Sequence, residues 1–158
     1  MADYSKLREE LTSDPLERGY SAMTDAEAAA DLNTEYRTRT VHISSAALLT
    51  WAGGGANDTT GVRSRYERIE ANGDESEQSS RAVRGACKAA VKMVERSDTY
   101  LDFDNTAHAA MVDGLVTGQV LTSDEKDELI AMGTETISRA TELGIGTVLP
   151  GYVTKARA

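Results

Sequence analysis

The spacing of apolar residues along the chain predicts a series of short amphipathic helices. The clearest pattern covers 80–97, where Val83, Cys87, Ala90 and Val94 recur at helical spacing and form one apolar stripe. Shorter patterns of the same kind, separated by glycine- and proline-containing turns, predict the remaining helices. These helices are expected at 5–12, 26–32, 44–51, 60–71, 104–117, 123–132 and 138–143. Ala107, Met111 and Leu115 should form the inner face of the helix at 104–117, and Leu129 and Met132 should point inward from the helix at 123–132.

Residues at several helix ends support this assignment. Asp14-Pro15 should end the first helix, because a residue before proline avoids helical backbone angles. Gly144 is expected just past the last helix. We therefore expect an all-α fold, an irregular bundle of about seven short helices, with an extended connector over 36–41 and an extended C-terminal tail over 145–158. Two capping boxes should start helices, Thr24 with Glu27 and Thr122 with Glu125.

The chain shows no internal repeat and no long linker, so the sequence predicts one helical domain over 1–158. Within this domain we expect N-terminal helices and a turn (1–40), a connector region (41–80), core helices (81–144) and the tail (145–158). A chain of this length can bury enough surface to hold a core without disulfides or metals.

Charge and composition exclude several classes of function. The net charge of −9 and the pI of about 4.7 argue against non-specific binding of nucleic acid by the whole surface, because phosphate backbones attract cationic surfaces, so nucleic acid is not the expected partner. There is no apolar run of about 18 residues, so we expect no membrane span, and the N-terminus lacks the pattern of a signal peptide. Cys87 is the only cysteine, which favours a packed thiol in a cytoplasmic protein.

Residues that could support catalysis or metal binding are sparse and scattered. His42 and His108 lie in unrelated segments, and neither has a second ligand at metal-binding spacing. Cys87 falls in an apolar stripe, where cysteines are usually unreactive. The glycines at 53–55 lack the ending of a phosphate-binding loop, and the acids over 98–104 lack the spacing of a calcium loop. We expect no enzyme activity, no cofactor and no metal.

The most distinctive surface feature is a basic stripe on the predicted helix at 80–97. At 100° per residue, its five basic side chains lie within an arc of about 120°. One interpretation is a contact ridge for a nucleic acid or for an acidic partner surface. The other is a solvated helix face paired with the acidic stretch over 70–77. The five residues are Arg81, Arg84, Lys88, Lys92 and Arg96.

Both ends of the chain resemble a known family. The segments DPLERGY (14–20), MTDAE (23–27) and DLNTEYRTR (31–39) are similar to the opening of a family of small proteins encoded in the structural gene block of tailed bacteriophages. The segments ISRATELG (137–144), PGYV (150–153) and AR (156–157) are similar to the end of its members. The segments GLV (114–116), LTS (121–123) and DELI (127–130) are also similar but less distinctive. The resemblance covers roughly the first 40 and the last 50 residues, and the stretch over 41–80 matches nothing known in the family.

The resemblance implies a virion structural or connector protein of the neck or tail, assembled in the host cytoplasm and acting by protein–protein binding. Its partners would be portal, neck or tail components and further copies of itself. The alternatives are an assembly factor that leaves before the particle matures, such as a tail-assembly chaperone, and a small acidic regulator that binds a host protein. The segment 14–20 is either a structural turn or a docking loop, in which Arg18 and Tyr20 would contact a partner.

Overall fold

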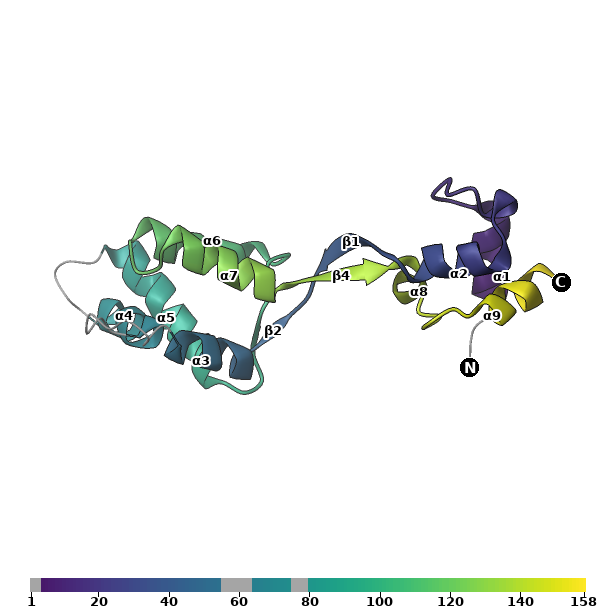
Figure 1. The fold of residues 1–158 in the computed structure, drawn as a ribbon. Coiled ribbons are helices and arrows are strands. Elements are labelled where there is room, and N and C mark those ends of the chain that lie inside the picture. The colour runs from purple at the N-terminus through teal and green to yellow at the C-terminus, as the bar shows by residue number, and fades with distance from the viewer. Residues whose placement is uncertain (1–3, 55–63, 75–79) are drawn as a thin grey trace. The chain divides into compact units, whose positions relative to one another are not determined.

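The computed structural model describes residues 4–54, 64–74 and 80–158 (Figure 1). Its contacts divide the chain into two compact units. Met1–Arg39 and Thr136–Ala158 form one, here called the end unit, and Thr40–Glu135 form the other, the central unit. The sequence predicted a single domain over 1–158. The division is not visible in the hydrophobic pattern, because the end unit is assembled from two segments that lie far apart in the chain.

The fold is mostly helical but not strictly all-α. In the described ranges, four short strands form two small two-stranded sheets, one pairing β1 with β4 and the other pairing β2 with β3. The predicted extended connector corresponds to β1. The strands β2 and β3, of two residues each, are too short to leave a periodic pattern in the sequence, and β4, of five residues, lies between two predicted helices and was not predicted.

The end unit contains helices from both ends of the chain. Its core is formed by Leu7, Tyr20, Leu32, Val153 and other apolar residues that are almost completely buried. The elements are α1 (Tyr4–Ser13), the 3-10 turn η1 (Tyr20–Ala22), α2 (Asp25–Asn33), β1 (Glu35–Thr40), β4 (Thr134–Ser138), α8 (Arg139–Glu142) and α9 (Pro150–Arg157). The last residue of β1, Thr40, and the first two residues of β4, Thr134 and Glu135, belong to the central unit.

The C-terminal tail was predicted to be extended, and this is wrong for most of its length. Residues from Pro150 to Arg157 form α9, which begins with proline in the first turn, where the missing N–H costs nothing. Val153 and Ala156 are three residues apart and are 0% and 1% exposed. Contact with the core of the end unit therefore stabilises a helix that is too short to form by itself.

The central unit surrounds a second apolar core, to which Cys87, Leu101, Leu115 and Leu129 contribute. Ile43 lies opposite Leu101 in the antiparallel β2–β3 pair. The elements are β2 (Ile43–Ser44), α3 (Ser45–Gly53), α4 (Arg65–Gly73), α5 (Arg81–Glu95), β3 (Tyr100–Leu101), α6 (Thr106–Thr117) and α7 (Ser123–Met132). The first residues of the predicted helix over 60–71 lie outside the described residues.

Side-chain burial confirms the apolar stripe on α5 and corrects details elsewhere. Cys87 and Ala90 are buried, and Val83 and Val94 pack at the edge of the same core. In α6, by contrast, Ala107 is exposed, and Val112 and Leu115 form the inner face together with the partly buried Met111. Met132 of α7 was expected to point inward but is 37% exposed.

Candidate functional site

The segment 14–20, which carries part of the family resemblance, is a turn closed by its own hydrogen bonds. The carboxylate of Asp14 accepts backbone N–H groups from Arg18 (2.8 Å), Gly19 (2.6 Å) and Tyr20 (3.3 Å). Burial disfavours the charged carboxylate, but these hydrogen bonds outweigh it and hold the pKa of Asp14 below its usual value. Gly19, with φ of +81°, adopts the left-handed conformation that glycine tolerates best.

The two candidate contact residues in this turn point into the end unit. Tyr20 is 0% exposed and belongs to the core, so its side chain offers no surface to a partner, contrary to the contact role expected for it from the sequence. Arg18 donates to Asp31 at 2.8 Å, and its guanidinium lies 4.4 Å from the ring centre of Tyr36. These contacts favour the structural-turn interpretation of 14–20.

Residues from the two ends of the chain bind each other directly. Arg157 donates to the carbonyl oxygens of Tyr20 (2.6 Å) and Met23 (3.0 Å) and to the carboxylate of Asp25 (2.6 Å). Thr154 donates to the other carboxylate oxygen of Asp25 at 2.5 Å. The side chains of α9 therefore hold the loop that precedes α2.

A second cluster of charged groups joins α1 to α8. Arg139 donates to both carboxylate oxygens of Glu10, at 2.8 and 2.5 Å, and the Glu10 side chain is only 2% exposed. Arg139 also donates to Glu142 at 2.7 Å, and Glu142 further accepts from Tyr36 and from Arg37. The hydroxyl of Tyr36 and the guanidinium of Arg139 lower the pKa of Glu142, so this network favours the ionised form of that carboxylate.

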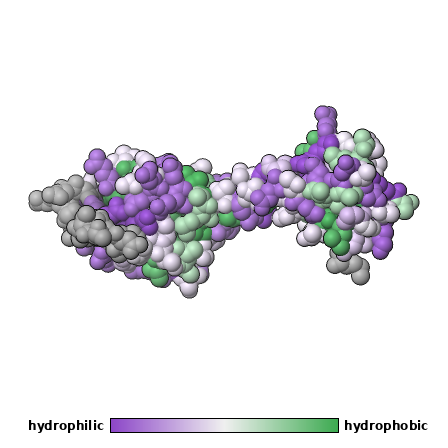
Figure 2. All heavy atoms as spheres, in the orientation of Figure 1, coloured by the Kyte–Doolittle hydropathy of each residue, from purple (hydrophilic) through white to green (hydrophobic). Residues whose placement is uncertain are grey.

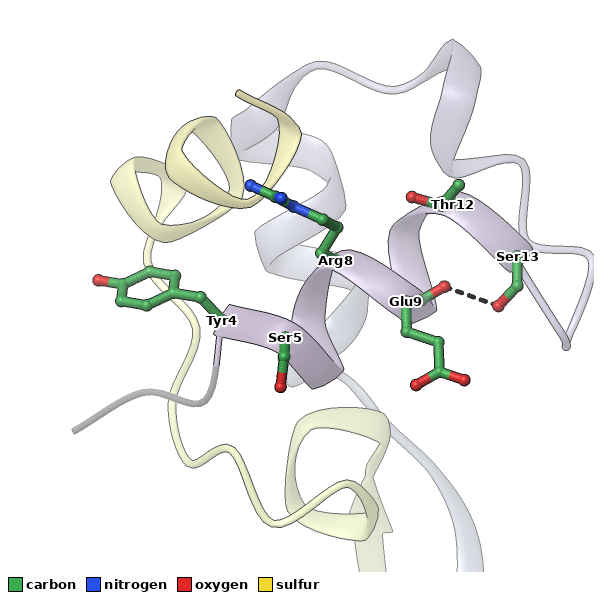
Figure 3. Close-up of a pocket in the computed structure, with 6 residues that line it drawn as sticks. All are labelled: Tyr4, Ser5, Arg8, Glu9, Thr12 and Ser13. Atoms are coloured by element: carbon green, nitrogen blue, oxygen red, sulfur yellow. Dashed lines mark hydrogen bonds between the residues drawn. The ribbon is translucent and has the colours of Figure 1, made fainter.

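A shallow depression lies along one face of α1 (Figure 3). The six labelled residues follow one another at helical spacing, and the only hydrogen bond drawn among them joins the Ser13 hydroxyl to the carbonyl oxygen of Glu9 at 2.6 Å. Neither histidine nor cysteine is among these described lining residues. The depression is lined by Tyr4, Ser5, Arg8, Glu9, Thr12 and Ser13.

The basic stripe predicted on 80–97 lies on the outer face of α5. Arg81, Lys88, Lys92 and Arg96 are exposed, and Arg84 is half-buried. Arg96 pairs with Asp98 at 3.0 Å. Within the parts of the chain that the structure describes, Lys88 and Lys92 form no ion pair. The acidic residues Glu75 and Glu77, which the solvated-face interpretation invoked, lie outside the described residues.

The structure brings both histidines of the chain to one place, which the sequence did not predict. The ring of His42 stacks on Tyr100, with centroids 4.0 Å apart, and its Nε2 lies 3.4 Å from Asp102 Oδ2. The backbone N–H of Asp102 donates to Nδ1 of His108 at 3.2 Å. Pairing of β2 with β3 creates this cluster, and strands of two residues leave no periodic pattern in a sequence.

These groups do not form a recognisable metal or nucleophile site. In the described ranges, no group of three or more His, Cys, Asp or Glu side chains is arranged to hold a metal ion. Cys87 is 0% exposed, and burial raises the pKa of its thiol, which disfavours the reactive thiolate. No described helix is long and apolar enough to cross a membrane.

Comparisons with models of protein families, with curated proteins and with solved structures find no significant match.

Proposed function

We propose that this chain is a structural or connector protein of a tailed-phage particle, in the neck or tail region, and that it acts by binding other protein chains. The observation that carries this proposal is the end unit. The segments that carry the most distinctive resemblance, within 14–39 and 137–157, lie at opposite ends of the sequence and fold together into one unit, whereas the less distinctive similarity over 114–130 lies in the central unit. Several polar side chains of the two end segments form hydrogen bonds within the end unit.

The hydrogen bonds within the end unit offer a reason why the most distinctive resemblance is found in short segments that lie far apart in the sequence. Asp14 closes a turn, Arg157 binds the loop before α2, and Asn33 binds the backbone near α9. Each role depends on the chemistry of one side chain, and all three side chains lie in the end segments that carry the most distinctive resemblance. A family built around this unit would share these positions and differ between them.

The proposal includes no catalytic step, and it assigns partner binding to surfaces. On the face of the central unit visible in Figure 2, hydrophobic residues form scattered patches among hydrophilic ones. Large exposed apolar side chains occur in both units, with Leu49 at 52% and Leu149 at 52% exposed. Portal, neck or tail components and further copies of the chain are the proposed partners.

Mass spectrometry of purified phage particles tests the proposal. A structural protein should be present at a fixed copy number in mature particles, and a phage lacking the gene should accumulate unjoined heads and tails or incomplete tails. Presence in assembly intermediates but absence from mature particles would instead identify an assembly factor. A stable monomer that captures one host protein and is absent from all particles would identify a regulator.

A further inference from the structure

We propose that the basic outer face of α5 binds the acidic outer face of α7 in a second copy of this chain, so that copies associate head to tail. The inference rests on the proposed function only for its premise that the chain works in many copies. It names the two surfaces that meet and the chemistry by which they do so.

The α5 face combines two features of a helix-docking surface. Its basic side chains lie beside a strip of three exposed small residues, Ala82, Gly85 and Ala89, which occupy an arc of about 60°. A Cβ atom added at Gly85 would meet no atom of the described residues within 4 Å, so these residues leave the space above the helix backbone open. A second helix can therefore approach this backbone closely while Lys88 and Lys92 reach its acidic groups.

The α7 face has the complementary composition. Asp124, Asp127, Glu128 and Ala131 are exposed and fall within an arc of about 100° on α7. Glu128 already accepts from Arg65 and from the indole N–H of Trp51. Asp124 and Asp127 form no ion pair among the described residues. This face therefore also presents uncompensated charge around a small residue.

One copy cannot satisfy both faces by itself. Cys87 and Ala90 of α5 and Leu129 of α7 point into the same core, and α6 packs against both helices. The two outer faces therefore point away from that core in different directions. A contact between different faces of two copies is heterologous, and its repetition produces a ring or a filament.

The net charge sets the conditions for this association. Each copy carries −9, so copies repel one another at long range. At an ionic strength of about 0.15 M, screening acts beyond roughly 8 Å, which reduces this repulsion and leaves close ion pairs in place. At about 1 M salt the ion pairs weaken as well, so association should be strongest at intermediate salt.

Site-specific cross-linking of the full-length protein tests the geometry. One preparation carries Gly85→Cys on α5 and the other carries Ala131→Cys on α7, and a short bismaleimide is added. We expect cross-linked dimers in the mixture and none in either variant alone, and the wild type, whose Cys87 is buried, serves as the control. Dimers of G85C alone would indicate a symmetric contact between two α5 faces and would overturn the proposal.

Charge exchange tests the chemistry. Light scattering measures the mass of the particles in solution. The double variants K88E/K92E and D124K/D127K should each be monomeric, and the variant that carries all four changes should associate again. The matched control K6E/K155E makes the same change in net charge within the end unit and should associate like the wild type. Circular dichroism verifies that every variant keeps its helices. Failure of the fourfold variant to recover association, with its helicity intact, would overturn the proposal.

A further variant tests whether a second helix must approach α5 closely, independently of the charges on the two faces. Gly85→Gln adds a side chain to the open strip, should make α5 a better helix, and should still reduce association at least tenfold.

Binding of a labelled DNA duplex that K88E/K92E abolishes, without any cross-linking, would assign the α5 face to nucleic acid and overturn the inference. If the chain is found in particles but does not cross-link, only this inference fails. If it cross-links but is absent from particles, only the proposed function fails.

Discussion

Asn33 and Val148, which are 115 residues apart, share two hydrogen bonds that tie α2 to the segment before α9. The side-chain Nδ2 of Asn33 donates to the carbonyl oxygen of Val148 at 2.7 Å, and the Val148 N–H donates to Asn33 Oδ1 at 2.9 Å. An amide is the side chain that can both donate and accept in this way.

Asn33→Asp keeps the acceptor but replaces the donor with an oxygen facing the Val148 carbonyl. We expect a loss of about 1–3 kcal/mol in the free energy of unfolding, because a partly buried carbonyl then lacks its partner. Urea denaturation at neutral pH measures this loss. Thr50→Ala removes an exposed hydroxyl that bonds only within α3, and should change stability by less than about 0.5 kcal/mol. Equal effects of the two changes would contradict this interpretation of Asn33.

Arg139→Met should be among the most destabilising single changes in the end unit. It leaves the Glu10 carboxylate, only 2% exposed, without its bidentate partner, and an unpaired buried charge costs about 3–5 kcal/mol. The double variant Glu10→Leu/Arg139→Met should regain most of this loss, because neither charge remains. Costs that simply add in the double variant would show that the two residues do not act as a pair.

Residues 40–135 should fold when expressed alone. The central unit has its own apolar core, and the N–H of Val41 donates to the carbonyl of Gly133 at 2.9 Å, so the two ends of this segment already lie together. We expect a helical circular dichroism spectrum and a cooperative urea transition. The fragment 1–39 lacks the core residues supplied by α8 and α9 and should show no such transition. An unfolded 40–135 fragment would contradict the division into two units.

Stability should fall in acid, and Glu142 should contribute to the fall. Its folded-state pKa lies below the usual value because Tyr36 and Arg139 stabilise the carboxylate, so the folded state binds the proton less tightly than the unfolded state. Its contribution is complete above the ordinary glutamate pKa of about 4.3 and is lost as the pH falls through the lower folded value. Urea denaturation from about pH 7 to pH 3 should therefore show wild type and Glu142→Gln converging in acid. A gap that stays constant with pH would argue against this role.

The Cys87 thiol should react slowly in the folded protein. It is 0% exposed, and burial raises its pKa, so little thiolate is available at neutral pH. Iodoacetamide labelling followed by mass spectrometry should show fast modification in urea and at least 100-fold slower modification without it. Rapid labelling of the native chain would instead indicate a reactive thiol that could act as a nucleophile.

The features that the sequence determined are local ones. Thr24 with Glu27 and Thr122 with Glu125 form the expected capping boxes, because each box involves only residues three apart. The apolar and basic stripes of α5 follow from helical periodicity in the same way. The basic half of the proposed contact could therefore be identified from the sequence. Its acidic counterpart on α7 became apparent only once both helices were placed on a common core.

The features that only the tertiary structure decided depend on contacts between distant segments. The chain ends meet in the end unit, α9 forms where an extended tail was expected, and Tyr20 lies in the core instead of on a docking loop. His42 and His108 meet at Tyr100 through two strands of two residues each. Local propensity is too weak to specify such short elements, so burial against a core formed by other parts of the chain determines their structure.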